Sequence, residues 1–143
     1  MRKFNVVYMR GGTSKGCLFH REDLPADPKE WDSIFLQVMG NPDPKQIDGL
    51  GGTVSSNNKI VVVWKSDVPD VDIEYLVGQV IVGKNQVDYK ANCGNMTSAV
   101  APFAVEEGLV PVVEPVTTVR MLNRNTDKYI NVTVPIDAAT HTF

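Results

Sequence analysis

The stretch that decides the fold is MTSAVAPFAVEE, residues 96–107, which carries no charged side chain before its last two positions. Its small and apolar residues, followed by Gly108, are typical of a helix and its C-terminal stop. A helix that is apolar on nearly all of its faces is covered by protein on nearly all of them. The sequence therefore predicts a buried central helix, with a kink or local loosening at Pro102.

The segments on both sides of this helix are mostly strand-forming. Runs rich in Val, Ile and Tyr between turn residues predict strands at 4–9, 17–19, 60–65, 71–82, 87–90, 116–122 and 129–134. A further helix is expected after the N-cap Asp27, with Pro28 at its first position and Gly40 at its end. Because a sheet shields an apolar helix by wrapping around it, we expect one α+β domain.

Composition excludes several classes of protein. The chain has 143 residues, 43% of them hydrophobic and 22% charged, which fits one globular domain. Fourteen Lys and Arg against 17 Asp and Glu give a net charge of −3, so nucleic acid is not an expected partner. The apolar run at 60–64 is far shorter than the roughly 20 residues of a membrane span. No secretory signal opens the sequence, so a cytoplasmic location and unpaired Cys17 and Cys93 are expected.

Three polar, glycine-rich segments are the candidates for function, at 11–16, 51–59 and 92–95. Glycine lets backbone N–H groups approach a ligand closely. The first segment lacks the spacing of a nucleotide-binding P-loop, because Lys15 stands between Ser14 and Gly16. It instead presents a hydroxyl, a cation and backbone donors, which suit a carboxylate, although a plain hairpin with an exposed lysine would look the same.

Two side chains in the other segments could carry proton chemistry. Lys59 stands where a polar loop becomes an apolar strand, so its amine could lie partly desolvated beside a ligand; the alternative is an ordinary solvated lysine. Cys93 precedes a predicted helix, whose N-terminal end favours a thiolate; the alternative is a small cysteine packed under the helix. Cys17 lies within an apolar run and is expected only to pack.

The sequence contains no motif that is typical of a metal site or of a serine hydrolase. There are two histidines, His20 and His141, and neither a Cys-x-x-Cys nor a His-Glu-x-x-His motif. No Gly-x-Ser-x-Gly motif is present. We therefore expect proton transfer without a metal.

Taken together, the three segments resemble a known family. The runs 9–16, 48–52 leading to Lys59, and 92–95 are similar, in this order, to the PrpF-type methylaconitate isomerases, whose relatives include methylitaconate Δ-isomerase and oxalomesaconate tautomerase. The resemblance implies a diaminopimelate epimerase-like fold, with a β-barrel-type domain wrapped around a central apolar helix. It also implies two such domains around a cleft, of which residues 1–143 would supply the N-terminal one, as a fragment or as a chain that stands alone.

The resemblance also implies a reaction. Similar proteins move a proton and a double bond in an unsaturated di- or tricarboxylate without a cofactor. Carried over, Lys59 and Cys93 are the acid/base pair and Ser14 a hydrogen-bonding group at the reacting end. The implied substrate-binding residues are Gly12, Thr13, Gly94, Asn95 and Met96. Met96 stands where the epimerases proper have a glycine, which favours the isomerase branch.

Two alternatives stay open. The chain could be a non-catalytic carboxylate-binding or accessory domain, because the second half of the cleft is absent from it. A lesser alternative is an epimerase of amino or hydroxy acids. The sequence selects neither the acid nor an oligomeric state, and a homo-oligomer is compatible with it.

Overall fold

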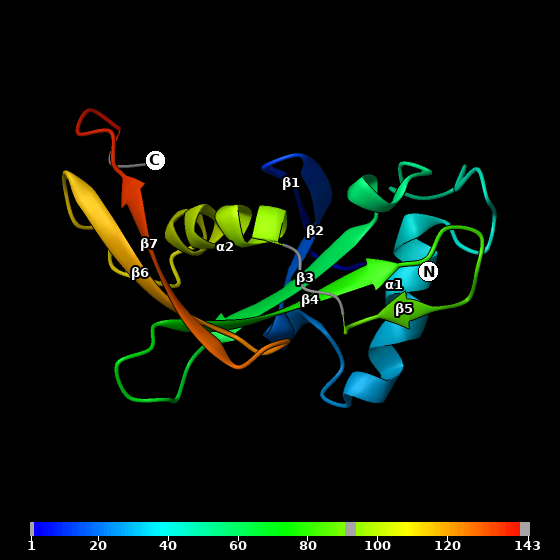
Figure 1. Cartoon of the computed structure of the whole chain (residues 1–143), viewed down its shortest axis with the longest axis horizontal. Coiled ribbons are helices and arrows are strands. Elements are labelled where there is room, and N and C mark those ends of the chain that lie inside the picture. Colours follow the sequence, from blue (N-terminus) through cyan, green and yellow to red (C-terminus); the bar gives the residue numbers. More distant parts are fainter. Residues whose placement is uncertain (1, 91–93, 141–143) are drawn as a thin grey trace.

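Seven strands form one sheet in the computed structural model, which describes residues 2–90 and 94–140. The sheet order is β1-β2-β3-β4-β6-β7, with the short β5 paired to β4 (Figure 1). The strands are β1 (Val7–Gly11), β2 (Ser14–His20), β3 (Lys59–Lys65), β4 (Ile73–Val80), β5 (Val87–Asp88), β6 (Val116–Asn123) and β7 (Lys128–Pro135). Each predicted strand is therefore present, with shifted ends.

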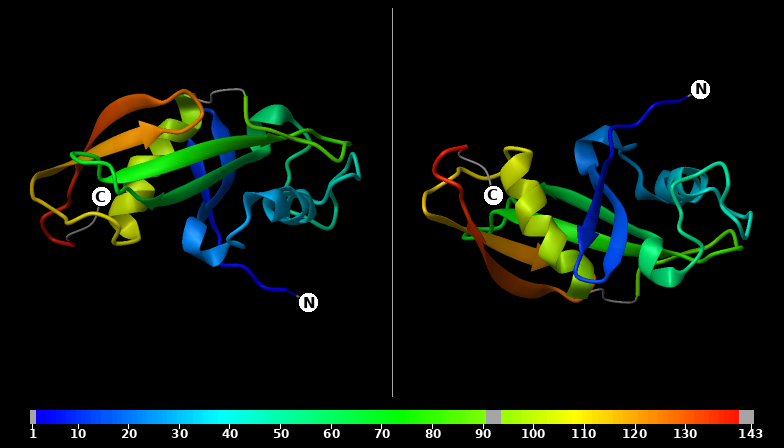
Figure 2. Two further views of the ribbon diagram at one scale, coloured as in Figure 1. Left: turned by 90° about the horizontal axis from the view of Figure 1, so that it is seen from below. Right: turned by 90° about the horizontal axis from the view of Figure 1, so that it is seen from above.

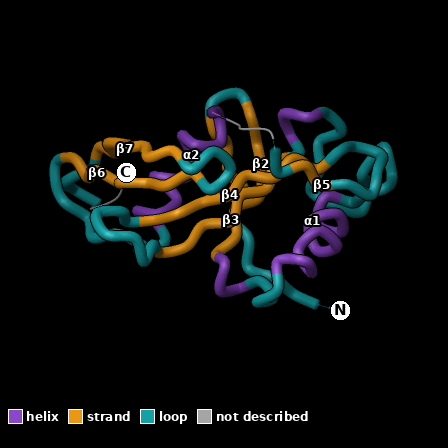
Figure 3. The backbone as a smooth tube through the Cα atoms, turned by 60° about the horizontal axis from the view of Figure 1, so that its bottom comes forward, coloured by secondary structure: helices purple, strands orange, loops and turns teal. Residues whose placement is uncertain are grey.

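Three antiparallel pairs are joined by two parallel ones. The pairs β1–β2, β3–β4 and β6–β7 are antiparallel, whereas β2–β3 and β4–β6 are parallel. A parallel pair needs a crossover connection, usually a helix. The two crossovers carry α1 (Trp31–Met39) and α2 (Gly94–Glu106). Figure 3 shows α1 beside β5 and α2 beside β7.

The two helices cover opposite faces of the sheet, because side chains alternate along a strand. On β3, Val61 and Val63 pack with α2, whereas Ile60 and Val62 pack with α1. The second helix is thus the centre of the larger core. Its buried residues are Met96, Ala99, Val100, Ala101, Phe103, Ala104 and Val105.

The sheet is a half-barrel rather than a closed barrel. It curls around α2, whose two sides contact β1 and β7 (Figure 2), yet these edge strands do not pair with each other within the described residues. The helix consequently keeps one stripe that is not buried, at Asn95, Ser98, Pro102 and Glu106. The expectation of cover on nearly all faces is correct except along this stripe. The helix runs through Pro102 without interruption.

The start of the first helix differs from the prediction. Asp27 caps a separate 3-10 turn, Pro28–Glu30, by accepting a hydrogen bond from the Lys29 backbone at 3.0 Å. The α-helix itself begins at Trp31 and ends at Met39, and it is followed by Gly40, whose φ of 87° is the left-handed conformation typical of a C-terminal glycine.

Candidate functional site

The first glycine-rich segment is the tight hairpin between β1 and β2. Gly12 and Thr13 form its turn, and Gly12 has a φ of 53°, a conformation that favours glycine. Ser14, only 2% exposed, begins β2 opposite Gly11, whereas Lys15 is exposed. The hairpin thus presents its backbone and Thr13 to solvent and keeps the Ser14 side chain inside.

The start of α2 lies directly on this hairpin. Asn95 Nδ2 donates a hydrogen bond to Thr13 Oγ1 at 3.1 Å. A Cβ atom on Gly11 would come within 2.4 Å of the Asn95 carbonyl oxygen, and one on Gly12 within 2.3 Å of Asn95 Oδ1. Glycine at both positions therefore permits the contact, and the first and third polar segments meet as expected of a shared site.

Lys59 joins the same end of the sheet through the parallel β2–β3 pair. It is opposite Gly16 in the register, and a Cβ atom on Gly16 would lie 2.4 Å from the Lys59 carbonyl oxygen. Lys59 is half-buried, and its Nζ donates a hydrogen bond to Gln79 Oε1 on β4. The cationic group is thus held by a specific partner rather than free in solvent.

Gln79 is a residue of this site that no sequence motif indicates. It lies opposite Lys59 in the antiparallel β3–β4 register. Its Nε2 faces the carbonyl oxygens of Ser55, Val80 and Asn58 at 3.0, 3.1 and 3.2 Å. A polar side chain between Gly78 and Val80 in an apolar strand was the available signal.

A buried amide network supports the loop that precedes Lys59. Gln46, 2% exposed, donates to Asn58 Oδ1 and to Asn41 Oδ1, and its own oxygen accepts from the Thr53 backbone at 2.8 Å. Asn58, fully buried, donates to the Val54 carbonyl at 2.8 Å. Because buried amides are satisfied only in a defined geometry, this network fixes the path of residues 53–58.

Of the remaining predicted site residues, Cys93 lies outside the described residues, whereas Gly94 and Met96 differ in their exposure to solvent. Gly94 is exposed at the start of α2, whereas the Met96 side chain is completely buried in the core, so only the Met96 backbone could contact a ligand. Cys17 is fully buried, and burial raises the pKa of its thiol to about 12, as suits a packing residue.

Other features bear on what the described residues could bind. A cavity of about 340 Å³ lies at the far end of β2 and β3, lined by His20, Trp64 and Glu107 among others, away from Lys59. No three His, Cys, Asp or Glu residues within 2–90 and 94–140 are grouped so as to hold a metal ion. In the same residues, no helix has the length and apolar character of a membrane span.

Comparison with known proteins gives a consistent result. Residues 1–141 match the sequence model of a family described as "PrpF protein". The putative isomerase YraM of Bacillus subtilis is 50% identical over 137 residues, 96% of this chain and 37% of that protein. The 4-oxalomesaconate tautomerase of Pseudomonas putida is 46% identical over 129 residues, 90% of this chain and 36% of the tautomerase.

Comparison with solved structures leads to the same group of relatives. A crystal structure of methylitaconate-delta-isomerase superposes with a TM-score of 0.91 at 41% identity, covering 94% of this chain and 35% of that one. A probable proline racemase from Agrobacterium radiobacter, 14% identical, has a TM-score of 0.63 over 95% of this chain and 38% of its own. A hydroxyproline epimerase from Agrobacterium vitis, 12% identical, has a TM-score of 0.61, so the fold is that of the racemase and epimerase structures. The chain spans little more than a third of the length of the relatives it matches.

Proposed function

Since this chain belongs to the PrpF family, we propose that it forms the N-terminal domain of an isomerase that moves a proton and a double bond within an unsaturated di- or tricarboxylate. The observation that carries the proposal is the meeting of three segments at one end of the sheet. The hairpin at 11–16 contacts the start of α2, and Gly16 is paired with Lys59. An amine, a hydroxyl-bearing turn and a helix start suit an anionic carbon acid.

The proposed reaction is a 1,3-shift of one proton. A base removes a proton from a carbon next to the double bond, and the electron pair of the broken C–H bond forms a new C=C bond. The former double bond opens towards the neighbouring carboxylate, which gives a dienolate. A proton is then added to the carbon next to this carboxylate, which restores the carboxylate and completes the shift. The formula of the acid is unchanged and no electron acceptor is needed.

The proposed roles follow from the chemistry of each group. Lys59 and Cys93 exchange protons with the two carbons, because amine and thiol are groups that act as general acid and base. Ser14 is assigned a supporting hydrogen bond at the reacting end. Carboxylate binding is assigned to Gly12 and Thr13 of the hairpin and to Gly94, Asn95 and the Met96 backbone of the helix start.

The opposite wall of the site is assigned to a second domain. Thr13, Gly94 and Asn95 are exposed and Lys59 is only half-buried, whereas general acid–base catalysis gains from excluded water. Relatives that are about two and a half times as long as this chain have the length for a second domain of similar size. The identity of the acid, whether methylaconitate, methylitaconate or oxalomesaconate, would then depend on both halves.

The test is isomerisation of these three acids and of aconitate, followed by ultraviolet absorbance. The complete two-domain protein that the proposal requires should convert at least one of them, and Lys59→Ala should remove the activity. Lys65→Ala is the matched control, because Lys65 is an exposed lysine at the other end of the same strand. Folded protein that binds a tricarboxylate in calorimetry without converting it would instead favour a carboxylate-binding domain, and equal activity of the two lysine variants would refute the role of Lys59.

A further inference from the structure

We propose that Gln79 is a positioning residue that directs the amine of Lys59 towards the substrate, an inference that rests on the proposed function. The two residues face each other across the β3–β4 pair, and Lys59 Nζ donates to Gln79 Oε1. A lysine side chain has four rotatable bonds, and a single defined acceptor removes most of that freedom. Proton transfer requires such an orientation, because the reacting atoms must lie within about 3–3.5 Å of each other.

The orientation of the Gln79 amide is itself fixed by the backbone. Its Nε2 lies 3.0–3.2 Å from three carbonyl oxygens, those of Ser55, Asn58 and Val80. A flipped amide would place Oε1 against these three acceptors and leave Nε2 facing a cationic donor. Only one orientation satisfies both sides, so the oxygen that holds Lys59 cannot exchange with the nitrogen.

The neutrality of Gln79 is the second part of the inference. An amide oxygen orients an amine through a hydrogen bond without adding a full negative charge beside it. A carboxylate at the same place would favour the charged ammonium and oppose its deprotonation. An amide therefore positions a lysine that must both take up and release a proton.

The same loop supports Gln79 from the other side. The carbonyl oxygen of Asn58 accepts from Gln79 Nε2 and from the Val80 backbone, while the Asn58 side chain accepts from the buried Gln46. The segment before Lys59 and the residue opposite it thus form one hydrogen-bonded unit. This arrangement gives the 51–59 segment a function of its own, as the support of the amine.

The experiment compares Gln79→Leu, Gln79→Glu and the matched control Gln86→Glu, which makes the same charge change at an exposed residue. In the isomerase assay, Gln79→Leu should lower kcat about 10–100-fold with a smaller change in KM, the size of effect that misplacement of a reacting group produces. In the pH–rate profile, the limb that reports deprotonation of the Lys59 amine should lie about one pH unit higher in Gln79→Glu than in the wild type. The same limb should not move in Gln86→Glu. Unchanged kcat in Gln79→Leu, or the same pH profile in all three variants, would overturn the inference.

A readout without substrate separates this inference from the proposed function. The ¹³Cε resonance of Lys59, identified by its loss in Lys59→Arg, is titrated in the wild-type protein and in both Glu variants. Its midpoint should move to higher pH in Gln79→Glu and stay in place in Gln86→Glu. If the midpoint moves but no acid is converted, the pairing stands and the proposed function fails; if it stays in place, the inference fails whatever the activity.

Discussion

Gly16 and Lys59 lie side by side across the parallel β2–β3 pair, and a Cβ atom on Gly16 would approach the Lys59 carbonyl oxygen to 2.4 Å and Lys59 Cβ to 2.8 Å. Backbone atoms cannot turn aside as a flexible side chain can, so Gly16→Ala must push the two strands apart. We expect a loss of about 3 kcal/mol in the free energy of unfolding, measured by chemical denaturation, together with lower isomerase activity.

The matched control for this substitution is Gly94→Ala. Apart from its neighbours in the chain, no described residue lies within 4 Å of a Cβ atom at Gly94, and alanine favours a helix. The free energy of unfolding of this variant should stay within about 1 kcal/mol of the wild-type value. Equal destabilisation by both substitutions would show that the close approach of β2 and β3 does not limit the residue at position 16.

Gly12→Ala should be more harmful than an alanine at another left-handed glycine. Both Gly12 and Gly108 have positive φ, 53° and 72°, so alanine adds a backbone strain of about 1–2 kcal/mol at either position. Only at Gly12 would the new Cβ also collide with Asn95, at 2.3 Å from Oδ1. In thermal unfolding, Gly12→Ala should have a lower midpoint temperature than Gly108→Ala. The reverse order would contradict the contact between the hairpin and α2.

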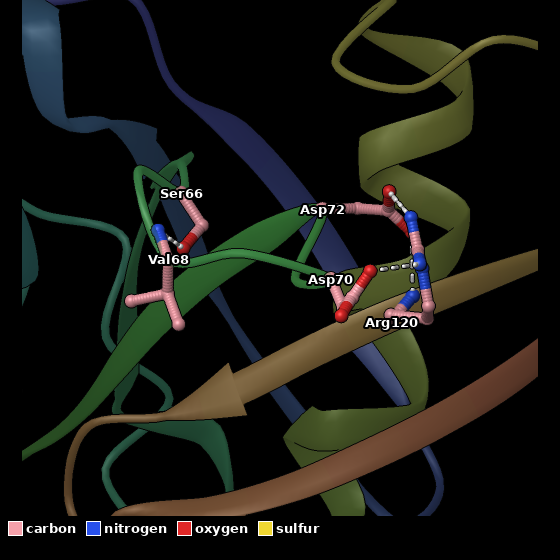
Figure 4. A network of polar contacts seen from close by, with 5 residues as sticks. All are labelled: Ser66, Val68, Asp70, Asp72 and Arg120. Atoms are coloured by element: carbon pink, nitrogen blue, oxygen red, sulfur yellow. Dashed lines mark hydrogen bonds and ion pairs between the residues drawn. The ribbon is translucent and has the colours of Figure 1, made fainter.

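An ion pair joins β6 to the connection before β4 and predicts sensitivity to acid. Asp72 accepts from the Arg120 backbone at 2.8 Å and from the guanidinium at 3.0 and 3.3 Å, beside Asp70 and the Ser66–Val68 turn (Figure 4). Desolvation raises the pKa of Asp72, but the hydrogen bonds and charge of Arg120 outweigh it, and the net pKa is lowered.

Because the pKa of Asp72 is lower in the folded state, its contribution to stability is present above its ordinary value of 3.8 and is lost as the pH falls through the folded pKa. Asp72→Asn should therefore reduce the free energy of unfolding by about 1 kcal/mol at pH 7 and by less near pH 3. Urea denaturation at the two pH values measures the difference. A loss of the same size at both would assign the effect to packing instead of charge.

The helices and strands were predictable from the spacing of apolar residues and from turn residues, because these local features determine where an element forms and which of its faces is buried. The apolar spacing of Trp31, Ile34 and Phe35, and the apolar residues of 96–107, correspond to the buried faces of α1 and α2. The open stripe on α2 was not predicted, because it depends on whether β1 and β7, more than 110 residues apart, pair with each other. The two-residue β5 was predicted too long for a related reason, since only pairing with β4 defines it.

The site was predictable only where a residue type alone suggests its chemistry. Lys59 and Asn95 stand in polar segments beside apolar ones, and their hydrogen-bond partners were found only in the structure. Gln79 and Gln46 carry amides that suggest no reaction, and their importance comes from contacts with residues that are distant in the chain or buried. Resemblance to a family supplies roles for reacting groups more readily than for the groups that hold them.

Cys17 should be unreactive in the native protein because of its burial. Cys17 is completely buried and its pKa is raised to about 12, so the reactive thiolate is scarce at pH 8. In the native protein at pH 8, iodoacetamide should leave the Cys17 peptide unmodified in mass spectrometry, whereas the denatured protein should be labelled there readily. Rapid native labelling of Cys17 would contradict its burial in the core between the sheet and α1.

Cys17→Ala then serves as the control for the proposed role of Cys93. Removing a buried thiol should lower the free energy of unfolding by about 1 kcal/mol and leave the isomerase as sensitive to iodoacetamide as the wild type. Cys93→Ala should abolish the activity itself, because the proposed acid/base partner of Lys59 is gone. If Cys93→Ala stays active, or if the activity of Cys17→Ala resists iodoacetamide, Cys93 is not the reacting thiol and proton transfer must use another group near Lys59.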